Sequence, residues 1–248
     1  MIMNQLKFNY RIFRTILVLG IVIMLVASAS AQSADEIIEK YIAAIGGRDL
    51  LKKTTSLYME GKSDVGGMEL DLRITVLNGA GYKAEYEAMG SAVVNCITPE
   101  GGWTINPFMG SGMAETMPES QFKEGKDQIY IGAPFSVYRE KGYKAEYVGT
   151  EEVSGVKAFK IKLTSPDGVL SWHFFDPSTG YLMKTVQQAQ AEGQTVEAFI
   201  LYNDYRVTGG LALPFKTYYN LGNMFELTNT ITKVELNKPV DATFFIKP

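Results

Sequence analysis

The residue types that most often carry chemistry are scarce in this chain. Its 248 residues include one histidine, His173, and one cysteine, Cys96. Imidazole titrates near neutral pH and a thiolate is a strong nucleophile, so both are candidates for catalysis. A general base also needs a placed partner and a pocket, and a reactive thiol needs a nearby positive charge. Because neither sequence context offers these, we predict that neither residue is catalytic, that Cys96 is buried, and that the protein is not an enzyme.

His173 lies in a segment with the alternation of a β-strand. Leu170, Trp172 and Phe174 fall on one face of that strand, and Ser171 and His173 fall on the other. This pattern predicts His173 to be a structural residue on the more polar face.

Metal and cofactor chemistry also lack their usual residues. One histidine and one cysteine cannot supply the common imidazole and thiolate ligands of zinc. A carboxylate site for calcium or magnesium could form at residues 151–152 or between Asp64 and Glu69, although charges beside turns are usually solvated. The sequence contains no G-x-S-x-G elbow, phosphate loop or dinucleotide fingerprint. We therefore predict no metal and no cofactor.

The first 31 residues have the features of an export signal. Lys7, Arg11 and Arg14 precede an apolar stretch at residues 16–27, and Ala-Ser-Ala at residues 29–31 fits a signal-peptidase site. This predicts a cleaved signal at residues 1–31 and a single domain at residues 32–248. The signal holds three of the 24 basic residues and none of the 27 acidic ones, so the remaining domain is acidic. Such a domain has no general attraction for nucleic acid or for an anionic membrane.

Period-two patterns predict that the domain is mostly β. In residues 156–164, Phe159, Ile161 and Leu163 alternate with polar residues, and Ser-Pro-Asp-Gly at residues 165–168 turns the chain into residues 169–175. A second turn leads into residues 181–184, which gives an antiparallel meander. Similar patterns predict further strands at residues 57–65, 68–76, 82–89, 92–98, 103–106, 196–205, 213–221 and 224–234.

Helices are predicted near both ends of the domain. Ser33 and Glu36 have the spacing of a capping box, and an apolar stripe at helical spacing follows them. That helix should end at Gly46 and Gly47 and lie with its apolar side on the sheet. A short helical segment is expected at residues 48–53, and Asp241 is expected to cap a last helical turn that buries Phe244 and Phe245. The stripe consists of Ile37, Ile38, Tyr41, Ile42 and Ile45.

Residues 107–142 interrupt the meander with a methionine-rich and glycine-rich insert. Helices are expected after Pro118 and at residues 133–141. Flexible thioethers make adaptable apolar surfaces, so the first part of the insert is interpreted either as a lid over the sheet or as a loop that packs its side chains into the core. The lid residues would be Phe108, Met109, Met113 and Met117.

Several short motifs resemble one protein family. The chain is similar to the periplasmic outer-membrane lipoprotein-sorting proteins of LolA/LolB type, in a divergent form. The resemblance implies an incomplete antiparallel β-barrel, a half-barrel, whose concave face is covered by helices, and a periplasmic protein that holds acyl chains. Arg73 and Arg206 are both possible counterparts of an arginine near the family's cavity. The motifs are Asp35-Glu36-Ile37-Ile38, Gly102-Trp103-Thr104-Ile105-Asn106-Pro107, Thr179-Gly180-Tyr181-Leu182, Asp204-Tyr205-Arg206, Leu213-Pro214-Phe215 and Pro239-Val240-Asp241.

Together these observations predict a carrier of lipoprotein acyl chains or another lipid, with membrane-associated donor or acceptor proteins as partners. Two other classes remain open: a sensor or protein-interaction module of the same fold, and a hydrolase, for which no convergent set of carboxylates is evident. The alkyl chain would lie against an apolar wall formed by Leu70, Leu72, Ile74, Phe159, Ile161, Trp172 and Phe174.

Overall fold

Alternating apolar and polar residues build one antiparallel sheet of 13 strands in the computed structural model, which describes residues 33–108, 112–191, 194–222 and 224–248. The predicted signal at residues 1–31 lies outside the described residues. The strands run along the sheet in the order β6-β5-β4-β3-β2-β1-β13-β12-β11-β10-β9-β8-β7. Their bounds are β1 (Ser56–Val65), β2 (Met68–Leu77), β3 (Gly81–Ala88), β4 (Ser91–Thr98), β5 (Gly101–Ile105), β6 (Glu115–Thr116), β7 (Lys144–Val153), β8 (Val156–Thr164), β9 (Leu170–Phe175), β10 (Leu182–Ala191), β11 (Gln194–Thr208), β12 (Leu211–Leu221) and β13 (Phe225–Leu236).

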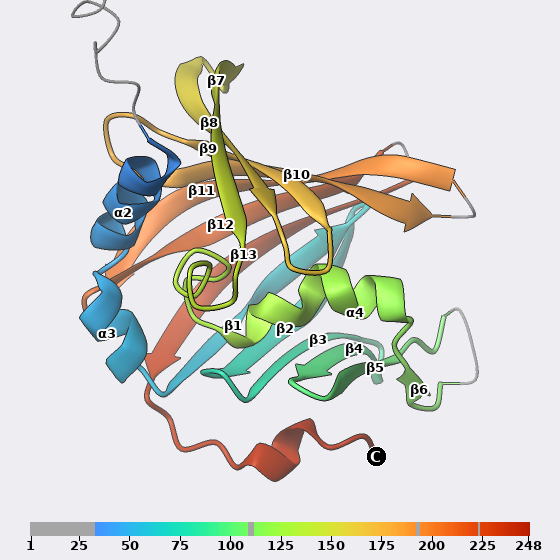
Figure 1. Ribbon diagram of the computed structural model, residues 1–248. Coiled ribbons are helices and arrows are strands. Elements are labelled where there is room, and N and C mark those ends of the chain that lie inside the picture. Colours follow the sequence, from blue (N-terminus) through green and yellow to red (C-terminus); the bar gives the residue numbers. More distant parts are fainter. Residues whose placement is uncertain (1–32, 109–111, 192–193, 223) are drawn as a thin grey trace, which may run out of the picture. The chain divides into compact units, whose positions relative to one another are not determined.

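The sheet is not closed into a barrel, because β6 and β7 form its two edges. In Figure 1 the strands curve around α4 and the chain that follows it, with α2 and α3 at one end of the strands. The predicted incomplete antiparallel barrel with helices over its concave face is thereby confirmed. The helical elements are α2 (Ala34–Ala44), α3 (Arg48–Lys53), α4 (Glu119–Gly125), and the 3-10 turns η1 (Lys126–Ile129) and η2 (Ala242–Phe245).

Helix α2 forms as its apolar stripe predicts. Its buried residues are Ile37, Ile38, Tyr41 and Ile42, and Asp35 and Glu36 place negative charge in its first turn. The helix ends where Gly46 and Gly47 take φ values of 124° and 84°. A side chain at Gly46 would also collide with the backbone oxygen of Gly210, 2.8 Å from the Cβ position. The chain can therefore leave α2 only through glycine.

Residues 130–142, called the plug from here on, are a series of turns, and the helix predicted at residues 133–141 is wrong. The Ser136 amide donates to Gly132 O over 3.0 Å, and the Val137 amide donates to Pro134 O over 3.1 Å. These bonds mix four-residue and three-residue spacings, and Pro134 has no amide hydrogen to continue a helix. The backbone path of the plug is therefore not set by a repeating helical hydrogen-bond pattern.

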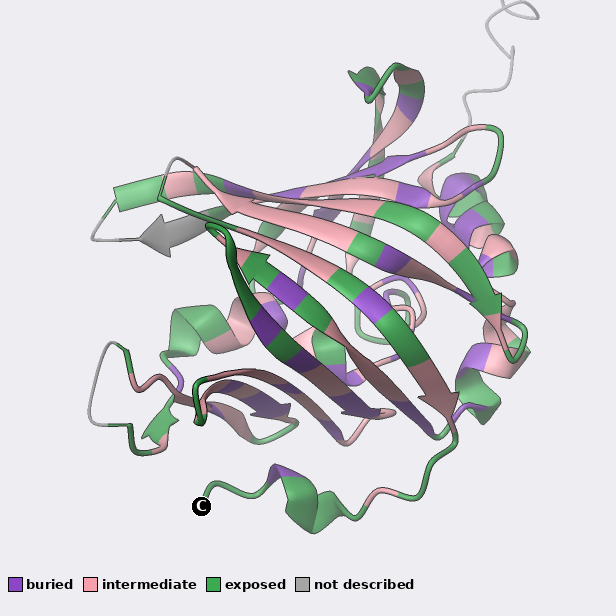
Figure 2. Ribbon diagram, turned by 180° about the vertical axis from the view of Figure 1, so that it is seen from behind, coloured by how far each residue is buried: buried purple, intermediate pink, exposed green. Residues whose placement is uncertain are grey.

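The C-terminal segment packs on the convex face of β3, β4 and β5, opposite to the concave face that the helices cover. As predicted, Asp241 caps a last turn, and its side chain accepts a hydrogen bond from the Thr243 amide over 2.8 Å. The predicted burial of both phenylalanines is confirmed for Phe245, which packs with Cys96 and Trp103, and is wrong for Phe244, which is exposed. The Trp103 indole donates to Phe245 O over 2.9 Å. Figure 2 shows this segment from behind as a mostly exposed ribbon, in which Phe245 is the buried residue of the last turn.

Candidate functional site

The face of the sheet that α2 and the plug cover is called the inner face, and cross-strand register shows which residues belong to it. Leu57 pairs with Val76, and both pack in one cluster with α2. Ile161, which belongs to the same cluster, pairs with His173. Since alternate residues of a strand share a face, these pairs assign each strand residue to the inner or the outer face.

Five of the seven residues predicted to line a cavity lie on the inner face, and two do not. Trp172 pairs with Lys162, and Phe174 pairs with Lys160, so both rings point to the outer face. The prediction that they share a wall with Phe159 and Ile161 is wrong. The residues on the inner face are Leu70, Leu72, Ile74, Phe159 and Ile161.

The two misplaced aromatic residues belong to an apolar layer on the outside of the sheet. Phe174 is buried in a cluster with Val153, Ala158 and Val186. Lysine side chains cover this layer, and the Lys184 ammonium lies 5.6 Å from the centre of the Phe174 ring. Strand β9 therefore buries side chains on both faces, so alternation alone could not show which set faces inward.

One half of the inner face is filled by the protein's own side chains. Phe135 of the plug is 0% exposed, and its ring centre lies 5.5 Å from that of Tyr41, 5.2 Å from Phe175 and 4.8 Å from His173. Ile161 is also 0% exposed and lies in the cluster that contains these phenyl rings. This region, next to α2, is called the plugged half.

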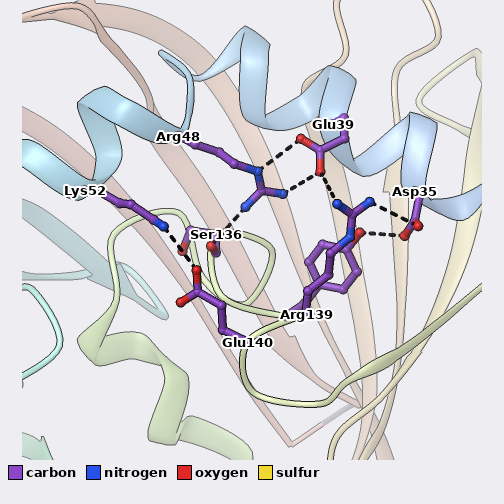
Figure 3. A network of polar contacts seen from close by, with 8 residues as sticks. Asp35, Glu39, Arg48, Lys52, Ser136, Arg139 and Glu140 are labelled. Atoms are coloured by element: carbon purple, nitrogen blue, oxygen red, sulfur yellow. Dashed lines mark hydrogen bonds and ion pairs between the residues drawn. The ribbon is translucent and has the colours of Figure 1, made fainter.

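A polar network on the surface fastens the plug to α2 and α3 (Figure 3). Arg48 donates to Glu39 through Nε over 3.1 Å and through Nη2 over 2.6 Å, and its Nη1 donates to Ser136 O over 3.2 Å. Arg139 pairs with Asp35 at 3.1 Å and with Glu39 at 3.4 Å. The hydrogen bond from Arg48 holds the pKa of Glu39 below its usual value. These contacts hold the solvent-exposed side of the plug against α2 and α3.

Lys52 and Tyr138 add two more contacts to this network. Lys52 of α3 pairs with Glu140 of the plug at 3.1 Å, and the Tyr138 hydroxyl donates to Asp35 over 2.6 Å. The ring of Tyr138 is buried while its hydroxyl reaches the network, so the side chain joins the plugged half to its polar border.

The other half of the inner face keeps apolar side chains that are only half-buried. Helix α4 crosses it: Phe122 packs with Ile97 and Met117, and the Glu124 carboxylate is close enough to Tyr219 of β12 to affect its pKa. Burial raises the pKa of Glu124 itself. This region is called the open half, and its half-buried apolar residues are Tyr86, Val93, Ile200, Tyr219 and Leu227.

Polar atoms without partners lie in the wall of the open half. Ser63 of β1 is 0% exposed and pairs with Asn229 of β13. Among the described residues, neither Ser63 Oγ nor Asn229 Oδ1 has a hydrogen-bond partner. A buried polar atom left unpaired costs about 1–3 kcal/mol. A ligand that brings a polar group as well as an alkyl chain could satisfy these atoms.

The residues predicted to form a lid are separated in the structure. Met117 is 8% exposed and packs with Ile97 and Ile129 near Gly102. Phe108 and Met113 are 62% and 70% exposed, so they do not cover the sheet, and Met109 lies outside the described residues. The core interpretation is right for Met117, and the covering elements are α4 and the plug.

His173 lies on the inner face and is buried, contrary to its predicted position on a polar face. The Ser171 hydroxyl lies 2.8 Å from its Nε2 atom, and the Thr185 hydroxyl lies 3.1 Å from Nδ1. Burial lowers the pKa of His173 to about 3. A base this weak gives little activation to a neighbouring serine near neutral pH. The hydroxyl groups satisfy both ring nitrogens of a neutral histidine.

Neither Cys96 nor the two arginines lie in a binding site. Cys96 is buried as predicted, and burial raises the pKa of its thiol to about 11. Arg73 pairs with Glu87 at 2.6 Å on the outer face, and Arg206 pairs with Asp204 at 2.6 Å. Within the described ranges, no three carboxylates, histidines or cysteines gather as metal ligands.

Two surface pockets lie away from the open half. One of about 220 Å³ lies between α3, the β2–β3 turn and the plug, and is lined by Arg48, Asn78 and Ser136 among others. Another of about 390 Å³ lies beside the C-terminal segment and is lined by Tyr58 and Phe244 among others. Neither contains the unpartnered Ser63 and Asn229 atoms.

The fold is shared with solved structures of low sequence identity. A LolA superfamily protein from Nitrosomonas europaea matches with a TM-score of 0.57 and 12% identity over 88% of this chain and 99% of that chain. A domain from Vibrio parahaemolyticus described as an outer membrane lipoprotein-sorting protein matches with a TM-score of 0.56 and 13% identity over 85% and 94%. A DUF1329 family protein from Desulfovibrio piger gives 0.57 and 10% over 84% and 95%.

These structures confirm the resemblance at the level of the fold. No protein-family model matches the chain, and no curated protein matches it. None of the helices in the described part of the chain is long and apolar enough to cross a membrane.

Proposed function

We propose that this protein is an exported, noncatalytic binding protein that holds the alkyl chain of a lipid or lipoprotein on the open half of its inner face. The observation that carries the proposal is the contrast within that face, where Ile161 is fully buried beneath the plug while Ile200 and Leu227, the cross-strand neighbours of Tyr219, remain half-buried. Each CH₂ group removed from water against such a wall stabilises the complex by about 0.8 kcal/mol.

The ligand is amphipathic in this proposal. Its alkyl chain lies along Ile200, Tyr219 and Leu227, and an amide N–H or hydroxyl group donates to Asn229 Oδ1, next to Ser63 Oγ. The atoms that lack partners in the apolar wall support a ligand with at least one polar group. The Vibrio domain of the same fold is described as an outer membrane lipoprotein-sorting protein, which supports a lipoprotein acyl chain as the ligand. A periplasmic setting and membrane-associated donor and acceptor proteins are further parts of the proposal.

The plugged half favours one alternative, a sensor or protein-interaction module that carries no ligand. If side chains fill the open half in solution as they fill the plugged half, no alkyl chain can enter. The weak basicity of His173 supports a noncatalytic role in either case.

Native mass spectrometry of the full chain, exported by a bacterial host and purified without detergent, tests the proposal. We expect a discrete added mass that extracts as lipid. Leu227→Asp, on the inner face, should abolish this mass, whereas Thr230→Asp on the exposed outer face of the same strand should retain it. A protein without ligand that also fails to bind added fatty acids or lipopeptides would favour the interaction module.

A further inference from the structure

Exposed methionine and phenylalanine residues gather at one end of the sheet. Because adjacent strands are antiparallel, the β1–β2, β3–β4, β5–β6 and β12–β13 turns all lie at the end of the strands away from α2 and α3. Figure 1 shows this end on the side of β6. Each of these turns exposes a methionine, and two also expose a phenylalanine. The set, called the rim, is Met68, Met89, Phe108, Met113, Met224 and Phe225.

The rim is unusual in composition for an exposed surface. Every exposed methionine among the described residues belongs to it, and Met89 is 98% exposed. Soluble proteins seldom gather large apolar side chains at their surface unless the surface binds something. Met68, Met89 and Met224 had no place in the sequence prediction of a lid, but the turns bring them to the same end as Phe108 and Met113.

The rim also borders the open half of the inner face. Phe225 lies two residues from Leu227, and Val65, at the turn before Met68, follows Ser63 on the inner face of β1. A ligand that leaves the open half at this end therefore passes the rim first. The opposite end of the inner face is blocked by α2 and Phe135.

The charged residues around the rim indicate which kind of membrane surface it can bind. A glutamate lies within two residues of the exposed methionine in each turn, and no lysine or arginine does; the four are Glu69, Glu87, Glu115 and Glu226. Single cations also lie close to these turns: Lys62 pairs with Glu69 at 3.1 Å, Arg73 pairs with Glu87 at 2.6 Å, and the Lys247 ammonium donates to Thr116 Oγ1, next to Glu115, over 3.2 Å. Such a border is not attracted by an anionic surface, which recruits clusters of lysine and arginine.

We propose that the rim docks on the surface of a zwitterionic phospholipid bilayer, so that an alkyl chain passes between the bilayer and the open half without crossing water. Separate turn tips with flexible thioethers suit the deformable boundary between headgroups and acyl chains, where apolar side chains insert from the surface. A protein partner would need a continuous, well-packed contact core, and the rim is divided among four turns. The transfer of an alkyl chain between the bilayer and the open half rests on the proposed function, whereas binding of the rim to a bilayer can be measured separately.

Flotation with phosphatidylcholine vesicles tests the proposal. The exported full chain should float with the vesicles, and replacing a quarter of the lipid by phosphatidylglycerol should not increase the bound fraction. Met89→Ser combined with Met224→Ser should lower partitioning at least tenfold. Val207→Ser removes an apolar side chain that is 69% exposed near the C-terminal end of β11, at the other end of the sheet, and should leave partitioning unchanged. All variants keep the same N-terminal segment, so differences between them report on the rim.

Three results would overturn the proposal: no binding to phosphatidylcholine vesicles, binding that requires phosphatidylglycerol, or equal binding by the double rim variant. Binding of a fluorescent fatty acid below its micelle concentration separates docking from the proposed function. The double rim variant should bind this monomeric probe like the wild type. If vesicles bind through the rim but the wild type never takes up the probe, the rim proposal stands and the alkyl-chain proposal fails.

Discussion

The plugged half and the open half belong to the same sheet, yet they differ in what covers them. On one row of paired residues, Ile161 and His173 of the plugged half are buried under Phe135, and Ile200 is half-buried toward α4. The plug is fastened by aromatic contacts and by the Arg48 and Arg139 network, whereas α4 is anchored mainly through Phe122. The difference teaches that the segments covering the sheet, and not the sheet alone, decide how deeply each part of its inner face is buried.

The largest effect is expected from removing the centre of the plug. Phe135→Ala should lower the free energy of unfolding by about 3–5 kcal/mol, because it leaves a cavity among fully buried rings. Phe225→Ala at the rim should change it by less than about 0.5 kcal/mol. Urea unfolding followed by circular dichroism measures both. Similar losses in the two variants would contradict the division between a packed and an exposed end.

The same substitution on the two halves gives the next largest contrast. Ile161→Ala should cost about 2–5 kcal/mol, and Ile200→Ala about 1 kcal/mol, since Ile200 keeps part of its surface in water. Ile200→Ala should also weaken binding of a fatty acid probe. If Ile200→Ala were as destabilising as Ile161→Ala, the open half would be packed core.

The buried histidine predicts a pH dependence. The folded pKa of His173, about 3, lies below its unfolded value of 6.5, so the unfolded state binds the proton more readily between these values and stability falls as the pH drops below 6.5. From pH 7 to pH 5 the loss should be about 2 kcal/mol.

His173 is the only histidine, so His173→Gln should remove most of this slope in urea unfolding at the two pH values. Glu124→Gln serves as a second variant in the same measurement. The pKa of Glu124 is raised in the folded state, so protonation of Glu124 favours folding as the pH falls, opposite to the effect of His173. An unchanged slope in His173→Gln would show that the imidazole is not buried as a neutral group.

The smallest effect is expected from the polar network. Arg48→Met should lower the free energy of unfolding by no more than about 1 kcal/mol, because the side chains of Arg48 and Glu39 are 32% and 41% exposed and solvent screens them. The loss should shrink in 1 M salt. Thermal unfolding at low and high salt measures it, and a loss equal to that of Phe135→Ala would make the network, rather than the ring, the main anchor.

Local sequence patterns were enough to predict most strands, but not which face of strand β9 points to the inner side of the sheet. The bounds of β8 follow directly from the alternation of Phe159, Ile161 and Leu163. The choice between the two faces of β9 failed because Phe174 and Phe175 are both buried, one under lysines and one under Tyr41. Which face is inner depends on where α2 and the plug pack, and that is a property of the tertiary structure.

The candidate site was accessible from the sequence in part. The insert was recognised as a covering element, but Met113 is exposed and Met117 packs in the core. The cover came instead from Phe122 and Phe135. Nothing local distinguishes Ser63 from an ordinary strand serine; its meaning comes from pairing with Asn229, which is far away in the chain. Methionines at successive turns were a usable signal for the rim.

The anchoring of Phe245 O by the Trp103 indole gives the molecule a built-in optical probe. The chain has two tryptophans: Trp103 reports on β3–β5 and the C-terminal segment, and Trp172 reports on β7–β10. Since both lie on the outer face, neither would touch the proposed ligand on the inner face. Single-tryptophan variants would therefore follow the melting of the two arms of the sheet independently, in the presence or absence of lipid.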